Sequence, residues 1–545
     1  MSVVKNQDYT VTIADMTTEG EGIGKVDGFP LFVKDTVVGD VARVRAIKVK
    51  KNYGYGRLME VLTPSADRVE AACPLARQCG GCTLQAMSYE AQLEWKRRKI
   101  EGNLKRIGGF LDLAVGPVIG MEHPWRYRNK TQVPFGTAKD GSVTAGFYAG
   151  RTHSIIPCED CLLSPEINEE ILSTIRTFMT EFKIPAYNEE TGTGIVRHAL
   201  IRNGFYTGQI MVCLVINSEM LPHAEELVAR LGRIPGMASV CLNINREKTN
   251  VILGSRVINL YGPGYLEDCI GELTFRISPL SFFQVNPQQT KKLYETALSF
   301  ADLTGNEIVW DLYCGIGTIS LFLAQKAKKV YGVEIIPAAI DNARENAVRN
   351  HLENTEFFVG KAEEVLPDWY REHGERADII VVDPPRKGCE ESLLATIVQM
   401  SPKRVVYVSC DSATLARDLK YLAGNGYRVE NVQGVDMFPW SGHVETVCLL
   451  SKLNAKQHIE VEIKMDELDL TSAKSKATYD EIKVYILQKY GLKVSSLYIA
   501  QVKQKCGIIE RENYNKAKSG DAKQPQCPPE KEAAIKEALI YFQML

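Results

Sequence analysis

The feature that most constrains the fold is a regular alternation of strand-like and helix-like segments between residues 274 and 453. Short β-rich runs alternate with longer segments of helical periodicity. Strands joined through helices run parallel, because the helix returns the chain to the starting edge of the sheet. The pattern predicts an α/β fold with a parallel, doubly wound sheet. The predicted strands are Glu307–Leu312, Lys329–Glu334, Thr355–Val359, Ala377–Asp383 and Arg404–Ser409, and a final pair, Tyr427–Met437 and Val444–Leu450, is expected to close the sheet. The predicted helices are Thr318–Ala327, Ala338–Asn350, a short one near Glu363, and Glu391–Met400.

The rest of the chain divides by composition. Residues 1–64 read as short strands with Gly-rich turns, which predicts a small five-stranded barrel of the oligonucleotide-binding kind. Residues 65–273 mix loops, strands and helices, and we assign them to a central α+β domain. After the alternating region at 274–453, residues 454–477 are polar and linker-like, and residues 478–545 form a Lys-rich helical extension. The expected strands of the barrel are Tyr9–Asp15, Gly28–Val33, Asp40–Lys50 and Arg57–Thr63.

One helix is predicted within the central region, at Tyr89–Ile107. Its spacing places apolar residues on one face and a basic run on the other. The apolar face consists of Leu93, Ile100, Leu104 and Ile107, and the basic run of Lys96, Arg97, Arg98, Lys99, Lys105 and Arg106.

Composition narrows the class of protein. Hydrophobic residues make up 45%, charged residues 24%, and the net charge is −2, as in ordinary globular proteins, which excludes collagenous, wholly disordered and membrane-embedded chains. The longest apolar stretch, Ile210–Ile216, is far shorter than the ~20 residues that span a bilayer. The first ten residues lack the apolar core of a signal peptide, so we expect a cytoplasmic protein without a membrane partner. Disulfides rarely persist there, so clustered members of the 14 cysteines become metal or catalytic candidates.

Three basic runs contain or adjoin aromatic residues, at 43–57, 96–106 and 123–130. Lys and Arg neutralise phosphates, and aromatic rings stack on splayed bases, so this mixture suits a nucleic acid. A single run is more simply a solvated surface. The three together, within about 90 residues, leave contact with RNA or DNA and plain solvation equally open.

A Gly-containing loop follows the first strand of the predicted sheet. Residues 309–318 read VWDLYCGIGT, a strand that turns into a helix, and Glu334 ends the next strand 19 residues after Gly315. Glycines let the backbone approach a ligand, and an acid at that place can hold ribose hydroxyls. The loop differs from the dinucleotide pattern G-x-G-x-x-G and resembles motif I of S-adenosylmethionine (SAM) methyltransferases. The alternative is a tight turn that simply needs two glycines.

A second candidate lies at the end of the fourth strand, where residues 379–388 read IIVVDPPRKG. The prolines stiffen the turn, so Asp383 can be held facing a cofactor. The alternative is a strand-end turn with a capping aspartate. In amino-methylating enzymes an aromatic residue follows the corresponding D-P-P, whereas Arg386 follows here, which favours a different target atom.

The atom that receives the methyl group is suggested by Cys410, at the end of the fifth strand. C5 of a uracil is too weak a nucleophile to take a methyl group from SAM directly. A thiolate that adds to C6 makes C5 enolate-like, and a base must afterwards remove the C5 proton so that the cysteine can leave. Glu445, at the start of the last strand, is the candidate base. The alternatives are a buried small side chain for Cys410 and a surface acid for Glu445. The competing cysteines are Cys314, Cys389 and Cys448.

A cysteine cluster lies in the loop before the predicted helix. Cys73, Cys79 and Cys82 form a C-x5-C-x2-C pattern with a Gly-Gly turn, and Cys158 or Cys161 could supply a fourth ligand. Thiolates brought together in this way suit a metal, because like charges otherwise repel. Zinc sites favour shorter spacings, whereas the wide gap and distant fourth ligand suit a [4Fe–4S] cluster. The spacing alone leaves zinc and the cluster open.

Taken together, these motifs resemble the bacterial RNA (uracil-C5)-methyltransferases, and in particular the branch with an N-terminal TRAM domain and an iron–sulfur cluster that modifies 23S ribosomal RNA. The segment Ser281–Asn286, SFFQVN, is similar to the family's F-F-Q-x-N. The resemblance covers residues 1 to about 453. It implies a Rossmann-like SAM methyltransferase domain, an oligonucleotide-binding-like TRAM barrel, and a central α+β domain that carries the cluster loop. The predicted helix at 89–107 would then pack on the catalytic domain.

The resemblance also assigns roles. It implies that Cys410 is the nucleophile and Glu445 the proton acceptor, and that Phe282 and Tyr313 hold the extruded base. The implied SAM contacts are Gln284, Tyr313, Glu334 and Asp383, and the implied cluster ligands are Cys73, Cys79, Cys82 and Cys161. Cys161 is preferred to Cys158 because the family places C-L/I-L/I after the H-S-I-I strand. A monomer is the default, and the extension after about 455 has no counterpart in many relatives.

Other functions remain to be weighed. The tRNA-specific relatives lack the TRAM domain and the cluster, which favours rRNA. RNA cytosine-C5 methylation also needs a cysteine adduct, but that class typically carries a further cysteine in the motif at Asp383–Lys387, where none stands here. A non-catalytic ribosome-assembly factor on the same scaffold is disfavoured by the intact Asp383, Cys410 and Glu445.

Overall fold

The computed structural model describes residues 3–150, 152–453, 479–506, 527–542 and 544–545. The chain forms two units, residues 1–457 and residues 458–545. The predicted linker at 454–477 lies outside the described residues. Among the described residues, no helix is long and apolar enough to cross a bilayer.

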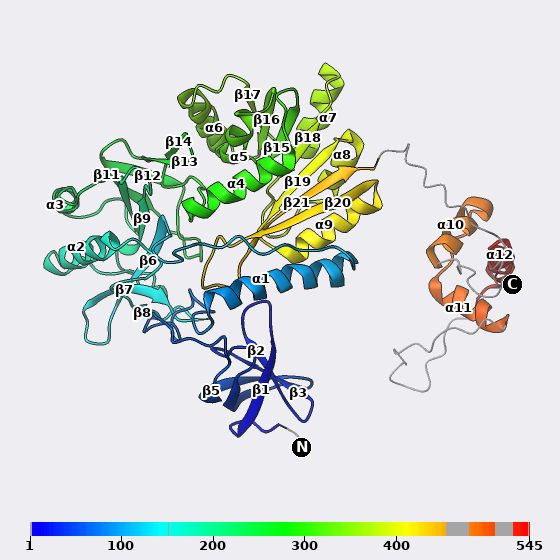
Figure 1. Cartoon of the computed structure of the whole chain (residues 1–545), viewed down its shortest axis with the longest axis horizontal. Helices are drawn as coiled ribbons and strands as arrows, with labels where there is room; N and C mark the ends of the chain where they lie inside the picture. Colours follow the sequence, from blue (N-terminus) through cyan, green and yellow to red (C-terminus); the bar gives the residue numbers. More distant parts are fainter. Residues whose placement is uncertain (1–2, 151, 454–478, 507–526, 543) are drawn as a thin grey trace. The chain divides into compact units, whose positions relative to one another are not determined.

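The N-terminal strands close into a barrel, as predicted, with the order β1-β2-β3-β5-β4 (Figure 1). Side chains alternate between the inside and the solvent along each strand, so that Val11, Leu31 and Val44 form the barrel core. The strands are β1 Asp8–Met16, β2 Gly22–Val26, β3 Phe29–Val33, β4 Val41–Val49 and β5 Gly54–Thr63. The sequence patterns missed β2, because its core-facing positions include two glycines.

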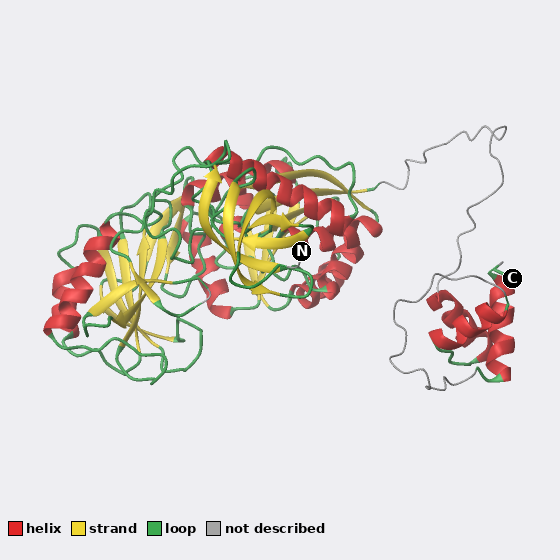
Figure 2. Ribbon diagram, turned by 90° about the horizontal axis from the view of Figure 1, so that it is seen from below, coloured by secondary structure: helices red, strands yellow, loops and turns green. Residues whose placement is uncertain are grey.

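The central domain is built on a seven-stranded sheet in the order β12-β11-β10-β9-β6-β7-β8. Helices α2 (Ile167–Glu181) and α3 (Ala224–Leu231) share one hydrophobic cluster with it, and Figure 2 shows them packed against the strands. The longest apolar run of the sequence, Ile210–Ile216, is the fully buried strand β10. The other strands are β6 Lys130–Thr137, β7 Val143–Tyr148, β8 Ile155–Pro157, β9 Val196–Asn203, β11 Met237–Ile244 and β12 Arg256–Tyr261.

The methyltransferase-like sheet has the order β17-β16-β15-β18-β19-β21-β20. Five strands are parallel, as predicted: β15 Ile308–Leu312, β16 Lys329–Glu334, β17 Thr355–Val359, β18 Ile379–Val382 and β19 Arg404–Ser409. Of the final pair of strands, only one departs from the parallel direction, and it lies inside the sheet. β21 (Glu445–Lys452) lies between β19 and β20 (Tyr427–Val435) and is antiparallel to both. Its first residues therefore pair with the last residues of β19, at the carboxyl edge of the sheet.

Helices cover both faces of this sheet (Figure 1). They are α4 Pro287–Ala301, α5 Thr318–Ala324, α6 Pro337–Arg349, α7 Ala362–His373, α8 Glu391–Met400 and α9 Ser412–Gly424. The sequence patterns identified neither α4 nor α9, and α7, at 12 residues, is longer than the short helix expected near Glu363. Two hydrophobic clusters fill the layers on either side of the sheet.

A hairpin crosses the predicted boundary between the central and catalytic domains. Strands β13 (Leu266–Ile270) and β14 (Leu273–Ile277) pair antiparallel, so a boundary at residue 273 cuts through them. Their buried side chains, among them Ile270 and Phe275, belong to the same cluster as the first strands of the methyltransferase-like sheet. The hairpin is therefore part of that core.

Helix α1 (Tyr89–Asn103) continues into a π-helical turn at Leu104–Gly108 and packs on α9 and β20. Ile100 and Leu104 are buried in the core beneath them, as the apolar face predicts. Two details of the predicted faces are wrong: Ile107 is 40% exposed, and Lys96, assigned to the solvent side, is fully buried against Asp436. Much of the remaining basic run is paired within the chain, since Arg97, Arg98 and Lys105 contact glutamates of the same helix.

The second unit contains helices α10 Tyr479–Tyr490, α11 Ser496–Lys505 and α12 Pro529–Tyr541, in keeping with the predicted helical extension. Ile482, Ile486, Ile499 and Ile535 are fully buried, so the helices share a small core of their own.

Candidate functional site

The Gly-containing loop lies where β15 ends and α5 begins. Tyr313, Gly315 and Gly317 all have positive φ, of 71°, 55° and 83°, so the loop turns sharply over the carboxyl edge of the sheet. A Cβ added at Gly315 would meet nothing within 4 Å, which leaves its backbone open to a ligand. The Gly315 N–H donates to Oε2 of Glu334 at 3.3 Å, and the Ile336 N–H donates to Oε1 at 3.1 Å. The predicted acid is thus held against the predicted loop.

Several residues around this loop escaped the sequence patterns. Ile335 and Ile336, directly after Glu334, are 60% and 56% exposed, although large apolar side chains are usually buried. Asp311 is buried, accepts a hydrogen bond from Ser320, and has one carboxylate oxygen without a partner. Burial raises the pKa of Asp311 to about 7. Gln284, predicted from the F-F-Q-x-N segment, is buried in the loop that leads into α4.

The loop after β18 is fastened to α9. Thr414 donates to the Arg386 carbonyl, and Arg417 donates to the Lys387 carbonyl. Asp418, fully buried, accepts from the Cys389 N–H at 2.8 Å. These bonds fix the rigid D-P-P turn, so that Asp383 and the exposed Arg386 keep set positions at the carboxyl edge of the sheet.

Cys410 lies between the end of β19 and the start of α9, where Asp411 caps the helix by accepting from the Ala413 and Thr414 N–H groups. It is partly exposed and lines a cavity of about 90 Å³. The cavity is lined by Glu19, Lys99, Arg386, Cys410, Asp411, Ser412, His443 and Val444. The barrel, helix α1 and the methyltransferase-like sheet therefore all contribute residues to this cavity.

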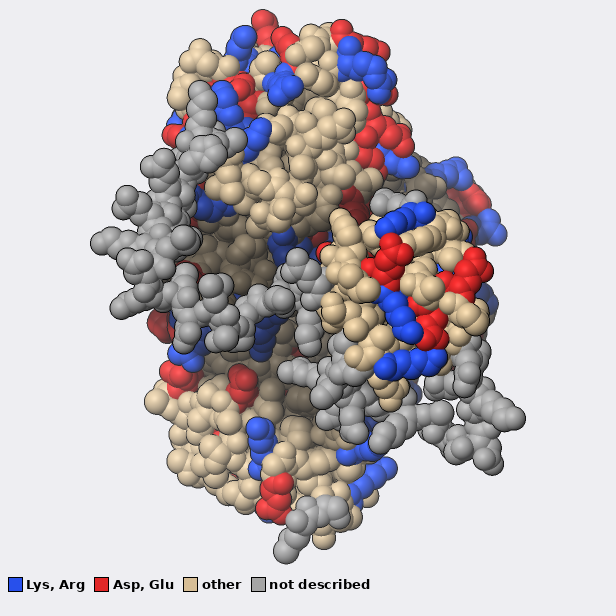
Figure 3. Space-filling model, turned by 90° about the vertical axis from the view of Figure 1, so that its right-hand side faces the viewer, with Lys and Arg blue, Asp and Glu red and all other residues tan. Residues whose placement is uncertain are grey.

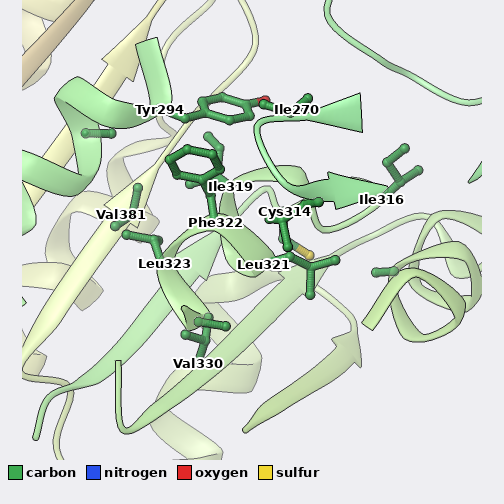
Figure 4. Packing of buried hydrophobic residues seen from close by; sticks show 14 of the residues in the cluster. Ile270, Tyr294, Cys314, Ile316, Ile319, Leu321, Phe322, Leu323, Val330 and Val381 are labelled. Atoms are coloured by element: carbon green, nitrogen blue, oxygen red, sulfur yellow. The ribbon is translucent and has the colours of Figure 1, made fainter. Parts of the chain in front are cut away.

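The cysteines that compete with Cys410 are placed differently. Cys314 lies among the apolar side chains of the core, as Figure 4 shows, and is 5% exposed. Cys389 is 5% exposed and Cys448 is fully buried, and both belong to the hydrophobic cluster that contains Ile100. Of these four thiols, Cys410 is the one that lines this cavity.

The strand arrangement brings Cys410 and Glu445 together. Ser409 pairs with Thr446, so the residues on their outer sides, Cys410 and Glu445, are neighbours across the β19–β21 ladder. Burial, and then the charges of Glu445 and Asp383, raise the pKa of Cys410 to about 12, while Arg386 acts in the opposite direction. Burial also raises the pKa of both carboxyl groups, and repulsion from Asp383 adds to the effect at Glu445. These two interacting carboxyl groups therefore retain a proton at higher pH than exposed carboxyl groups do.

The five clustered cysteines face a second cavity, of about 310 Å³, in the central domain. Cys73, Cys79 and Cys82 come from the loop before α1, and Cys158 and Cys161 from the turn after β8. Arg128 and Lys130, from the third basic run, also line it, and burial lowers the pKa of Lys130 to about 8. Within the described residues, no three or more Cys, His, Asp or Glu side chains stand so that they could hold a metal ion.

Comparison with known proteins agrees with this architecture. Residues 270–453 match the family model tRNA (Uracil-5-)-methyltransferase, and residues 3–59 match the TRAM domain. Proteins described as uncharacterized RNA methyltransferases are similar over 83% of this chain and 98% of their own length. One from Halalkalibacterium halodurans is 51% identical, and one from Clostridium acetobutylicum 52%.

A solved structure is also similar: the Pyrococcus abyssi tRNA (uracil-54, C5)-methyltransferase in complex with S-adenosyl-L-homocysteine, with 28% identity, a TM-score of 0.65, and coverage of 81% of this chain and all of that one. The family matches, the closed N-terminal barrel and the methyltransferase-like sheet lead to the same conclusion. The chain belongs to the family of TRAM-containing, SAM-dependent RNA (uracil-5)-methyltransferases.

Proposed function

We propose that this protein methylates C5 of uridine in 23S ribosomal RNA, with Cys410 as the nucleophile and Glu445 as the base. The observation that carries the proposal is the antiparallel β21, which sets Glu445 beside Cys410 at the carboxyl edge of the sheet, where Asp383 and Arg386 also lie. These four side chains come from three segments of the chain, and two of them, Arg386 and Cys410, line the cavity. A base and a cation beside a thiol are what a cysteine-adduct mechanism requires.

In this mechanism the Cys410 sulfur bonds to C6 of the uracil, and the ring becomes nucleophilic at C5. Bound SAM supplies an electrophilic methyl group. Glu445 then removes the proton from C5, the C6–sulfur bond breaks, and the thiolate is released. Because the pKa of Cys410 is raised in the free protein, the thiol needs a proton acceptor when it attacks, and Arg386 favours the thiolate that results.

SAM is proposed to bind along the carboxyl edge of β15 and β16. Glu334 would hold the ribose hydroxyls, since its carboxylate is already oriented by two backbone N–H groups. The exposed Ile335 and Ile336 offer apolar cover for the adenine. Gln284, Tyr313 and Asp383 complete the proposed contacts, and the open backbone at Gly315 gives the ligand room to approach.

The RNA is proposed to contact the barrel and the edge of the cavity. Phe32, Tyr53 and Tyr55 form an aromatic cluster on the outer barrel face, with ring centroids 5.5–5.8 Å apart, and such rings stack on bases. Phe282, proposed to hold the extruded base, is 67% exposed. On the face seen in Figure 3, Lys and Arg are interspersed with Asp and Glu. The protein is proposed to act as a monomer.

The choice between rRNA and tRNA is the finer part of the proposal. The similar Pyrococcus abyssi protein is a tRNA methyltransferase and covers 81% of this chain. A shared layout therefore does not by itself favour rRNA, and tRNA uridine is the main alternative. RNA cytosine-C5 methylation and a non-catalytic assembly role are weaker, because the D-P-P-R turn lacks a second cysteine and the candidate nucleophile faces a cavity.

A covalent trap tests the function. The anaerobically prepared protein is mixed with SAM and 5-fluorouridine-substituted 23S rRNA fragments or tRNA, and a denaturing gel is run. Fluorine at C5 cannot leave as a proton does, so the adduct stays attached after methyl transfer. We expect a SAM-dependent, retarded band with rRNA. A band with tRNA alone would reverse the substrate assignment, and no band with either RNA, while SAM still binds, would exclude the adduct mechanism.

We also propose a [4Fe–4S] cluster at Cys73, Cys79, Cys82 and Cys161. A cluster of several irons holds its ligands farther apart than a single ion does, so thiols spread around a cavity suit it better than zinc. The cavity has room for such a group, and Arg128 and Lys130 also line it. A structural role is the default. The fifth thiol, Cys158, donates to the Asp160 carbonyl at 3.4 Å, which supports Cys161 as the ligand.

Exchanging the two neighbouring cysteines tests this ligand set. We expect Cys161→Ser to lose most of its iron and its broad visible absorption, because serine is a poor ligand for iron in a cluster. Cys158→Ser, the matched control, should retain about four irons per chain, as the wild-type protein does. Iron content, acid-labile sulfide and visible absorption of anaerobically purified protein are the measurements. Loss of iron in Cys158→Ser but not in Cys161→Ser would reverse the assignment.

A further inference from the structure

Helix α1 holds the segment that leads into β21. Four polar side chains on one face of the helix bond to residues 436–442: Tyr89 to Asp436, Gln92 to the Trp440 N–H, Lys96 to Asp436 and to the Phe438 carbonyl, and Lys99 to the Gly442 carbonyl. Their spacing of three and four residues keeps them in one line along the helix. The segment they hold ends three residues before Glu445.

Lys99, the last member of this line, also reaches the barrel. Its Nζ donates to the Gly442 carbonyl at 2.7 Å and to the Thr18 carbonyl at 3.0 Å. Thr18 lies in the turn between β1 and β2, so one ammonium group joins the barrel to the turn before β21. Bonds from a charged donor are stronger than neutral ones.

The two joined turns are in close contact. A Cβ added at Gly442 would lie 3.1 Å from the Thr18 carbonyl oxygen and 3.5 Å from the Trp95 ring. Gly442 is itself buried. A side chain there would press against the barrel, so glycine permits the barrel turn to approach as closely as it does.

Each of the two carbonyl groups that Lys99 joins is followed in the chain by a residue of the Cys410 cavity. Glu19 follows Thr18, His443 follows Gly442, and both line the cavity that contains Cys410. We propose that Lys99 is a positioning residue that docks the barrel onto the Gly442–His443 turn, so that the barrel completes the pocket in which Cys410 meets the target base. This rests on the proposed role of Cys410.

The docking has a consequence for substrate recognition. An RNA strand bound to the barrel is then held at a fixed distance from Cys410, and Glu19 of the barrel lines the pocket that the base enters. RNA binding and base capture become one event instead of two independent ones. Such positioning acts on the rate of adduct formation more than on SAM affinity, because a small displacement of reacting groups costs up to about 100-fold.

Hydrogen exchange tests the docking without reference to catalysis. We compare Lys99→Met with Lys105→Met, a control on the same helical segment whose Nζ contacts Glu101. In Lys99→Met, amide exchange at residues 17–21 and 441–444 should be at least about fivefold faster, because both turns lose their common donor. The control should not change these segments. Unchanged exchange in Lys99→Met would overturn the proposal whatever the catalytic result.

The second measurement is the single-turnover rate of adduct formation with 5-fluorouridine RNA. We expect Lys99→Met to be about 10- to 100-fold slower with SAM binding within twofold of wild type, and Lys99→Arg to recover part of the rate. Faster exchange with a rate within twofold of wild type would refute the role in base capture. If the wild-type protein forms no adduct with either RNA, the proposed function fails, and the exchange result alone decides whether the barrel is docked by Lys99.

Discussion

Glu445→Gln forms a methylated RNA–protein adduct that persists with ordinary, unfluorinated RNA. Glutamine can still occupy the buried position at the start of β21, but it cannot accept the C5 proton, so the bond from Cys410 to C6 does not break. Turnover should fall by about 10²–10⁴-fold, the range typical for loss of a general base. The adduct is measured on a denaturing gel and by mass, which should equal protein plus RNA plus one methyl group.

Two further variants serve as controls for Glu445→Gln. Cys410→Ala should form no adduct with any RNA, yet bind SAM as wild type does. Glu430→Gln, in the neighbouring strand β20, removes a carboxylate that pairs with Arg428, and should turn over normally. A Glu445→Gln protein that turns over at the wild-type rate would move the base to another residue, with Asp383 the first candidate.

Adduct breakdown, the step in which Glu445 acts as the base, should depend on pH. Burial and the neighbouring Asp383 raise the pKa of Glu445 above its usual 4.5, so a proton occupies the pair well above the pH at which exposed carboxyl groups ionise. The base works only when unprotonated. Adduct breakdown should therefore accelerate as pH rises through the neutral range, and Glu445→Gln should lose that dependence. The same shift makes the folded state bind more protons than the unfolded state, so it lowers stability as pH rises.

Local patterns predicted the first five strands of the methyltransferase-like sheet closely. Strands such as Lys329–Glu334 and Arg404–Ser409 are buried on both faces, and short runs rich in valine and tyrosine identify them directly. The Gly-containing loop and Glu334 could also be placed, since both follow from the order of strands alone. What the patterns missed depends on pairing between distant segments.

Helix α1 illustrates the limit. Its periodicity put Lys96 with the basic residues, and a lysine is normally exposed. The residue that makes its burial possible, Asp436, is 340 positions away and carries no local signal. The contribution of Glu19 to the Cys410 cavity is hidden for the same reason. The antiparallel direction of β21 was missed because its apolar run reads alike in either direction.

The buried Lys96–Asp436 pair leads to the other large expected effect. Both side chains are 0% exposed, their charged atoms are 2.5 Å apart, and burial lowers the pKa of Lys96 while Asp436 opposes that shift. Lys96→Met leaves the Asp436 carboxylate buried without its cation, so the free energy of unfolding should fall by about 3–5 kcal/mol. Arg43→Met, which breaks the half-exposed Arg43–Glu60 pair, should cost about 1 kcal/mol or less.

Urea unfolding followed by fluorescence measures both losses, and the double variant Lys96→Met with Asp436→Asn separates their causes. Asparagine carries no charge and can still accept the Tyr89 hydroxyl, so the double variant should regain much of the stability lost in Lys96→Met. If Lys96→Met loses no more free energy of unfolding than Arg43→Met, the Lys96–Asp436 pair does not hold the segment before Glu445. If the double variant is no better than Lys96→Met, lost packing and not the unpaired charge accounts for the effect. Recovery of stability would show that the catalytic edge of the sheet is held by compensation between two buried charges.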